Sequence, residues 1–203
     1  MPKVYVVGND RAIVRMFMGQ GWTPVDEADW STDLIQFTGG EDVDPSYYGE
    51  KRHPSTRSNP VRDAWESTIY HENLGTTPMA GICRGAQFLN VMNGGRLWQN
   101  VTNHAIAGKH EAFCNVFEKP LMVTSTHHQM MIPAGRGKVL MAAQVAGVKS
   151  TAEEDFQGNL SPDIEAVFYP ETQSLCYQPH PEYVTINDEC QETYFQYINK
   201  FLM

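Results

Sequence analysis

A cysteine between two glycines is the feature of this sequence that most directly indicates chemistry. Gly81 and Gly85 flank Cys83. An apolar run at 78–82, typical of a buried strand, precedes the cysteine, and apolar residues at helical spacing follow at 84–92. Gly-x-Cys-x-Gly at a strand-to-helix turn is the cysteine form of a nucleophile elbow, and the helix N-terminus behind it favours the thiolate. The pattern predicts a nucleophilic thiol, with a small buried cysteine beside a turn as the plain alternative.

A histidine and a glutamate could supply the base and its orienting group, which a cysteine nucleophile requires. His180 and Glu182 follow an apolar run at 174–178 and are separated by Pro181. The proline disfavours helical backbone at His180, and in extended chain residues two apart point to the same side. Glu182 can therefore hold the imidazole in a Cys-His-Glu triad. A structural turn fixed by the prolines is the alternative from these residues alone.

Backbone donors for an oxyanion are the remaining requirement. Arg84, the residue after the nucleophile, offers one N–H group. The other could come from the loop at Gly39 and Gly40, where absent side chains let backbone approach a substrate closely. This loop follows an apolar run at 34–37, at the carboxyl edge where open sheets usually place their sites. A plain turn is the alternative.

Histidines raise the question of a metal site. Zinc prefers ligand types that occur here at four positions: His127, His128, His180 and Glu182. A metal held by them would leave the cysteine elbow unexplained, so we expect none. His104 and His110 have no metal-like partner at close spacing, and we predict that they are surface or packing residues.

The first half of the chain alternates strand and helix patterns. A β-rich run at 3–7 precedes apolar residues at helical spacing over 11–18. Residues 41–60 are predicted to form a loop long enough to be functional. Pro60 then starts a helix to about residue 74, with Asn59 as its cap.

The second half is predicted to be richer in strands, at 113–117, 121–125, 138–145, 148–150, 164–169 and 174–178. The last two are expected to pair with each other. Residues 95–109 and 151–163 are expected to be irregular, and a C-terminal helix packs its apolar face on the core.

Composition excludes several classes of protein. The net charge of −9 over 203 residues argues against partners such as nucleic acid or a membrane surface. Four widely spaced cysteines without a Cys-x-x-Cys pair argue against a zinc ribbon or thioredoxin motif. No apolar run approaches the ~20 residues that span a bilayer, and the N-terminal run is too short for a signal peptide. We therefore expect a cytoplasmic protein with reduced thiols.

Several motifs occur together and in a characteristic order: Thr38 to Pro45, Tyr48 to Glu50, Arg62-Asp63 with Glu66, Gly81 to Gln87 running on to Gly95, Ser125 to Gln129, and His180 to Glu182. With this set the chain resembles the class I glutamine amidotransferase-like superfamily. More closely, it is similar to the peptidase C26 branch of γ-glutamyl hydrolases, which includes γ-glutamyl-γ-aminobutyrate hydrolases. The matching stretches cover residues 38–182, most of the chain.

The resemblance implies an α/β fold, a flavodoxin-like three-layer sandwich with a central mainly parallel sheet, as one domain over residues 1–203. It implies that Cys83 is the nucleophile, His180 the base and Glu182 its orienter. It also implies an oxyanion hole formed by the backbone amides of Gly40 and Arg84. Positions that hold the glutamyl head group match Gln87, His127, His128 and Gln129. No metal or organic cofactor is implied.

The predicted function is cysteine-dependent hydrolysis of a γ-glutamyl amide through a γ-glutamyl thioester, with release of glutamate. The alternative is a stand-alone glutaminase subunit that supplies ammonia to a separate synthetase, which would then be a partner. A third interpretation, a catalytically silent binding protein, would be marked by a lost triad member. Relative to the family, the loop after Tyr48 and residues 96–112 look trimmed on the leaving-group side, so the amine released is not predicted. A homodimer is compatible with the sequence.

Overall fold

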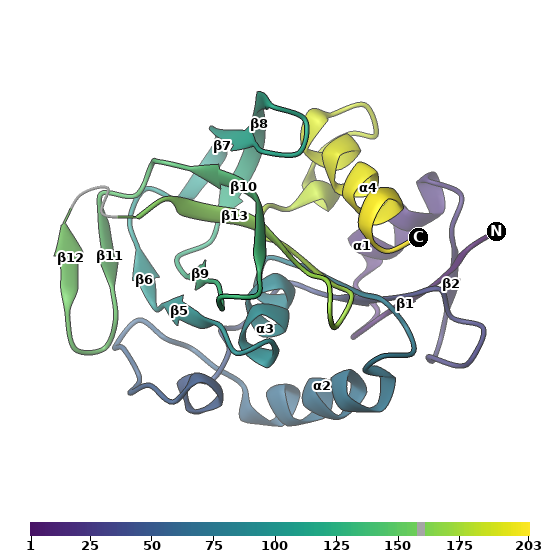
Figure 1. Cartoon of the computed structure of the whole chain (residues 1–203), viewed down its shortest axis with the longest axis horizontal. Helices are drawn as coiled ribbons and strands as arrows, with labels where there is room; N and C mark the ends of the chain where they lie inside the picture. The colour runs from purple at the N-terminus through teal and green to yellow at the C-terminus, as the bar shows by residue number, and fades with distance from the viewer. Residues whose placement is uncertain (158–160) are drawn as a thin grey trace.

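The centre of the molecule is a nine-stranded mixed sheet in the order β2-β1-β3-β4-β14-β13-β10-β7-β8 (Figure 1). This computed structural model describes residues 1–157 and 161–203. The strands are β1 Lys3–Val6, β2 Thr23–Val25, β3 Leu34–Phe37, β4 Met79–Ile82, β7 Ala105–Cys114, β8 Lys119–Thr126, β10 Lys138–Ala143, β13 Asp163–Tyr169 and β14 Ser174–Tyr177. Strands β2, β1, β3, β4 and β14 run parallel, and those beyond β14 are antiparallel.

Helices cover both faces of the parallel part, which gives the predicted three layers. Helices α1 (Arg11–Gly19) and α4 (Glu189–Phe201) pack on one face, and α2 (Pro60–Asn73) and α3 (Arg84–Met92) on the other (Figure 1). Strand side chains alternate between the two cores, as the period of a strand requires: Leu34 faces α1 and α4, whereas Ile35 faces α2 and α3. The α/β sandwich with a parallel centre is confirmed.

Local sequence explains where the helices begin. The Asp10 carboxylate accepts hydrogen bonds from two backbone amides in the first turn of α1. Asn59 caps α2, and Pro60 occupies its first position, where no backbone N–H is needed. Both helix starts confirm the predicted boundaries, because capping depends on residues close together in the chain.

Two segments predicted to be irregular contain strands. Residues 95–109 hold β5 (Arg96–Trp98), β6 (Asn100–Val101) and the start of β7, and residues 151–163 hold β12 (Asp155–Gln157). Strand β5 pairs with β9 (Met130–Ile132), and β11 (Val148–Ser150) pairs with both β6 and β12. Strands β5 and β6 each pair with a strand more than 30 residues away in the chain, and β12 pairs with the nearby β11. Local periodicity cannot reveal pairing over such distances. Within 151–163, residues 158–160 lie outside the described residues.

The single-turn helices η1 (Pro45–Tyr48) and η2 (Pro181–Tyr183) complete the described elements. Among the described residues, no helix is both long and apolar enough to cross a membrane.

Candidate active site

Cys83 occupies the sharp turn between β4 and α3, as the elbow pattern predicts. Its backbone has φ 51° and ψ −110°, a conformation that non-glycine residues rarely adopt. A Cβ atom on Gly81 would lie 2.3 Å from the carbonyl of Gly85, and one on Gly85 would lie 2.5 Å from the carbonyl oxygen of Phe37. Both glycines are therefore needed for α3 to pack against the sheet directly behind the cysteine.

His180 is fixed at the end of β14 by contacts on three sides. Its backbone N–H donates to Thr124 Oγ1 at 2.7 Å, and its imidazole stacks parallel on Tyr183 with 4.4 Å between ring centroids. Nδ1 lies 2.6 Å from Oε1 of Glu182, whose side chain is buried. The predicted contact of Glu182 with His180 is present, but Glu182 reaches the ring from the single turn η2 at Pro181–Tyr183 and not from extended chain.

Cys83 and His180 meet at Gly39. A Cβ atom on Gly39 would lie 3.0 Å from His180 Cε1 and 3.8 Å from Cys83 Cβ, so a side chain there would press on the imidazole. Burial opposes a charge on His180, but hydrogen bonds to the Cys83 side chain and to Glu182, together with their charges, outweigh it and raise the pKa of His180 to about 10. The ring is therefore an imidazolium at neutral pH, beside the cysteine.

The loop that carries Gly39 and Gly40 is held from behind by Arg62. Arg62 Nη2 donates to the carbonyl oxygens of Thr38 and Gly39, each at 3.0 Å. Gly40 has φ 134°, and a Cβ atom there would lie 2.2 Å from Arg62 Nη1. Only glycine fits. Because the C=O and N–H of a trans peptide point in opposite directions, the N–H of Gly40 points away from Arg62.

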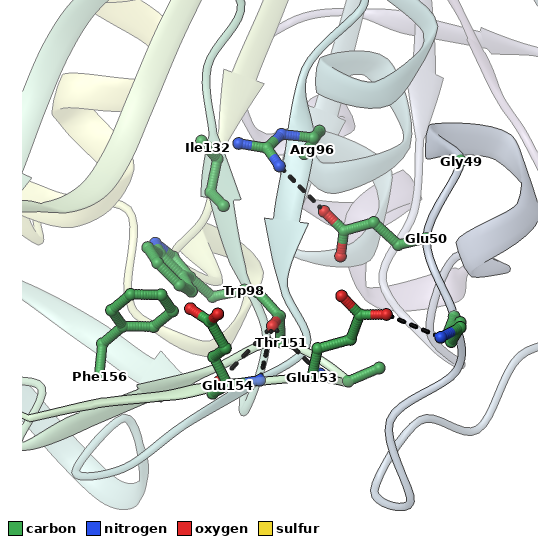
Figure 2. Close-up of a pocket in the computed structure, with 11 residues that line it drawn as sticks. Gly49, Glu50, Arg96, Trp98, Ile132, Thr151, Glu153, Glu154 and Phe156 are labelled. Atoms are coloured by element: carbon green, nitrogen blue, oxygen red, sulfur yellow. Dashed lines mark hydrogen bonds and ion pairs between the residues drawn. The ribbon is translucent and has the colours of Figure 1, made fainter.

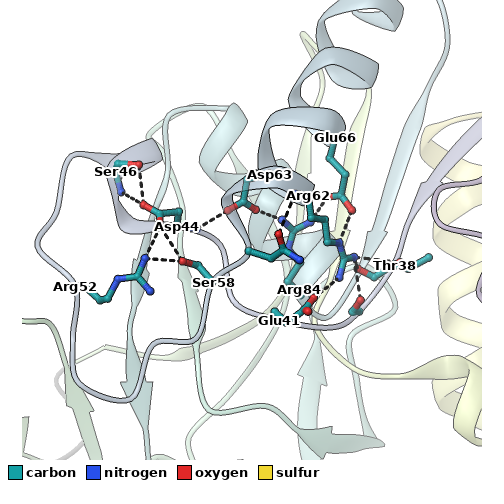
Figure 3. A network of polar contacts seen from close by, with 12 residues as sticks. Thr38, Glu41, Asp44, Ser46, Arg52, Ser58, Arg62, Asp63, Glu66 and Arg84 are labelled. Carbon is teal, nitrogen blue, oxygen red and sulfur yellow. Dashed lines mark hydrogen bonds and ion pairs between the residues drawn. The ribbon is translucent and has the colours of Figure 1, made fainter.

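The Arg84 side chain lies in a buried ionic network (Figure 3). Its guanidinium binds the carboxylates of Asp63 and Glu66 on α2, and Glu66 also accepts a hydrogen bond from Arg62 Nε at 2.8 Å. Arg62, Asp63 and Glu66 stood in the matched motifs without an assigned role. Their spacing within one helical turn was the available signal, since it places them on one side of α2.

A cavity of about 150 Å³ opens beside Cys83 and contains every predicted site residue except His180 and Glu182. It is lined by Gly40, Glu41, Asp42, Arg57, Cys83, Arg84, Gln87, Thr126, His127, His128 and Gln129. Arg57 belongs to no motif and was missed. No local pattern marks it, because it reaches the cavity from near the end of the long 41–60 loop.

The predicted head-group residues differ in what they offer to a ligand. His128 is partly exposed and lies 3.1 Å from Asp42 through Nε2. Gln87 donates to the carbonyl of Gln129 at 3.0 Å, and His127 Nδ1 lies 3.0 Å from the same carbonyl. Oε1 of Gln129 is buried and has no hydrogen-bond partner among the described residues. Gln129 Oε1 and His127 Nε2 are therefore both without a partner among the described residues, while Gln87 and His127 Nδ1 contact the main chain of Gln129.

A buried ionic cluster lies behind His127. His104 and His110 are buried, so the surface alternative for them is wrong, and both contact carboxylates of β13: His104 Nε2 lies 3.1 Å from Asp163 and His110 Nε2 lies 3.0 Å from Glu165. His104, His110 and Glu165 each place one ligand atom within 4.8 Å of the others, a spacing that could hold a metal ion. Both nitrogens of His104, His110 Nε2 and Glu165 Oε1 already have hydrogen-bond partners, whereas His110 Nδ1 and Glu165 Oε2 have none among the described residues; Lys149 lies 2.6 Å from Asp163 and offsets its charge.

A larger cavity, of about 460 Å³, shares no residue with the cysteine cavity (Figure 2). Trp98 and Phe156 meet edge to face on one side of it, with 5.1 Å between ring centroids. Glu50 and Glu153 on the other side are paired with Arg96 and Lys51. Its lining includes none of the residues to which the sequence assigns chemistry.

Replacing Glu182 with glutamine is expected to lower the pKa of His180 by about one pH unit or more, because the amide removes a charge that stabilises the imidazolium. Since folding raises the pKa of His180 from 6.5 to about 10, its protonation contributes stability that is complete below pH 6.5 and lost as pH rises to about 10. NMR titration of the imidazole measures the change, with the exposed His71 as internal control. An unchanged midpoint would show that Glu182 does not govern this ring.

Comparison with known proteins agrees with this architecture. A family profile described as Peptidase C26 matches residues 23–182. A Mycobacterium tuberculosis protein provisionally named a glutamine amidotransferase is 34% identical over 172 residues, covering 75% of this chain and 51% of its own length. The glutamine amidotransferase-like protein YvdE of Lactococcus lactis is 31% identical over 170 residues, covering 74% of this chain and 66% of its own length. The match thus spans about half to two thirds of these relatives.

Among solved structures, a glutamine amidotransferase from Thermotoga maritima superposes with a TM-score of 0.62 at 15% identity. The superposition covers 98% of this chain and 84% of that protein, which supports a shared fold. Because the family profile extends over most of the sequence, including the cysteine elbow and the His-Pro-Glu segment, the chain belongs to the peptidase C26 family.

Proposed function

We propose that this chain hydrolyses a γ-glutamyl amide through a γ-glutamyl thioester on Cys83. The observation that carries the proposal is the approach of Cys83 and His180 around Gly39, with Glu182 Oε1 2.6 Å from the far ring nitrogen of the histidine. A cysteine, a base and an orienting carboxylate in this relation form a nucleophilic triad. Family membership supports an enzyme of this general class.

The reaction then follows from the charge state of the pair. In the proposed reaction His180 takes the proton of Cys83, and the sulfur attacks the γ-carbonyl carbon while the carbonyl oxygen becomes the oxyanion. His180 gives that proton to the leaving amine as the C–N bond breaks, which leaves a thioester. A water molecule then loses a proton to His180 and attacks the thioester carbon, and Cys83 leaves with glutamate released.

Two backbone amides would receive the oxyanion of each tetrahedral intermediate. The N–H of Arg84 follows the nucleophile directly, and the N–H of Gly40 points away from Arg62, which holds the carbonyl of the same peptide unit. Both positions border the cysteine cavity. The Arg84 side chain is tied into its ionic network, so it leaves this space to the substrate.

The cavity presents opposite charges that suit the α-ammonium and α-carboxylate of a glutamyl group. Asp42 and the free Oε1 of Gln129 can accept from the ammonium, and Arg57 and His128 can donate to the carboxylate. Gln87 and His127 would act indirectly, by positioning the main chain of Gln129. The small volume beside Cys83 favours a compact head group over a bulky acyl chain.

The second candidate is a glutaminase subunit that forms the same thioester from glutamine and passes ammonia to a separate synthetase. The provisional amidotransferase name of the 34% identical relative favours it. Under this alternative the chain alone would turn over slowly and would need its partner.

Glutamate release by the purified chain, from L-glutamine and a panel of γ-glutamyl amines, tests the proposal. We expect a γ-glutamyl amine to be hydrolysed faster than glutamine, with Cys83→Ala as the inactive control. Negligible release from every substrate, with Cys83 still rapidly alkylated by iodoacetamide, would favour the partner-dependent glutaminase. Release that persists in Cys83→Ala would reject the thioester mechanism.

A further inference from the structure

Glu66 is the one carboxylate of the described network that contacts both arginines beside the proposed oxyanion hole (Figure 3). Oε1 accepts a hydrogen bond from Arg62 Nε at 2.8 Å, and Oε2 binds Arg84 Nη1. The Glu66 side chain is buried, so it has little freedom to exchange these partners for water. Asp63 also binds Arg84, but its second oxygen accepts from the backbone N–H of Asp44 at 3.0 Å.

Each arginine controls a different oxyanion donor. Arg62 grips the carbonyls of Thr38 and Gly39, which sets the plane of the peptide whose N–H belongs to Gly40. Its Nη1 also packs so closely on Gly40 that no Cβ atom fits between them. Arg84 carries the other donor on its own backbone, and its side chain anchors that first turn of α3 to α2.

We propose that Glu66 is a positioning residue that holds the two oxyanion donors in fixed register with each other. This inference rests on the proposed function for its catalytic consequence. The two donors come from segments more than 40 residues apart in the chain, and their separation must suit a single oxygen atom. One carboxylate that binds both supporting guanidinium groups supplies that constraint with one rigid, planar group.

Glu66→Gln tests the proposal with nearly the same shape. A glutamine side chain has one oxygen and one NH₂ group, so it can accept from one arginine but presents donors to the other. The variant therefore loses the hydrogen bond of residue 66 to one of the two arginines. We expect kcat for the best γ-glutamyl substrate to fall by about ten- to a hundredfold, below the cost of removing an oxyanion donor outright. KM should change by less than about threefold, because the head-group contacts are intact.

Asp63→Asn is the matched control, since Asp63 is an equally buried carboxylate that binds Arg84 and does not contact Arg62. It should lose comparable stability with a clearly smaller loss of kcat. Alkylation of Cys83 by iodoacetamide needs no oxyanion hole and should stay near the wild-type rate in both variants. If Glu66→Gln does not fold, Glu66→Asp, whose shorter side chain cannot reach both guanidinium groups, replaces it and is judged by the same two readouts.

A substrate-independent readout separates this proposal from the proposed function. The backbone amide of Gly40 should show a changed NMR shift in Glu66→Gln and not in Asp63→Asn. If the wild type hydrolyses no γ-glutamyl amide, the proposed function fails. The NMR comparison still tests whether Glu66 positions the backbone amide of Gly40. An unmoved Gly40 amide, kcat within twofold of wild type in folded Glu66→Gln, or an equal loss in Asp63→Asn would each overturn it.

Discussion

Cys83→Ala is expected to reduce glutamate release by about four orders of magnitude or more, because no other group can form the thioester. The remaining cysteines, Cys114, Cys176 and Cys190, are buried in the core, and burial raises the pKa of the Cys176 and Cys190 thiols. All three are therefore inaccessible, and Cys176 and Cys190 also stay protonated at neutral pH. Initial rates with the best substrate of the γ-glutamyl panel measure the loss.

The control for this prediction is Cys190→Ala, which removes a buried thiol on α4 far along the chain from the elbow. It should keep nearly the full rate. Peptide mapping after brief iodoacetamide treatment should find the label on Cys83 and not on the other three cysteines. Wild-type turnover in Cys83→Ala, or labelling confined to another cysteine, would contradict the assignment of the nucleophile.

Arg84→Met is expected to lower the free energy of unfolding by about 3–5 kcal/mol. The side chain is fully buried and binds two carboxylates that are themselves buried, Asp63 and Glu66. Methionine fills much of the volume but leaves Asp63 without its guanidinium partner and Glu66 with Arg62 alone, in surroundings where burial already raises the pKa of Asp63. Urea unfolding followed by circular dichroism measures the change.

The pH dependence of this variant distinguishes the electrostatic cause from poor packing. Without Arg84, the buried carboxylates bind protons more tightly in the folded than in the unfolded state, so the variant gains stability as pH falls toward about 5. The deficit against wild type should therefore shrink from pH 7 to pH 5. A deficit that is independent of pH would indicate a packing defect. Arg136→Met, which breaks the exposed pair with Glu171, is the surface control and should change stability little.

The elbow and the His-Pro-Glu segment could be predicted because each depends on a few adjacent residues. The sharp turn at Cys83 requires glycine at positions 81 and 85, because a Cβ atom at either position would collide with backbone atoms. Likewise, Pro181 restricts His180 to a conformation that lets Glu182 reach the ring. Helix starts at Asp10 and Asn59 follow the same logic of local hydrogen bonding.

The ionic network and the short strands could not be predicted, because their partners are distant in the sequence. Arg84 meets Asp63 and Glu66 only once α2 and α3 lie side by side on the sheet. No partner for His104 or His110 lies close to them in the sequence. The antiparallel half of the sheet places Glu165, more than 50 residues further along the chain, beside both histidines. Such contacts form only when the elements pack together, so they produce no periodic pattern in the sequence.

By itself, the sequence determined the chemistry available to this protein: a thiol at a strand-to-helix turn, a histidine with its carboxylate two residues on, and the alternation that builds a parallel sheet. Backbone sterics and capping act over a few residues, so they can be read along the chain. Only the tertiary structure decided that Gly39 brings Cys83 and His180 together, that Arg57 enters the cavity, and that Glu66 joins Arg62 to Arg84. Those relations depend on how segments pack, because burial sets both the distances and the strength of the charges between them.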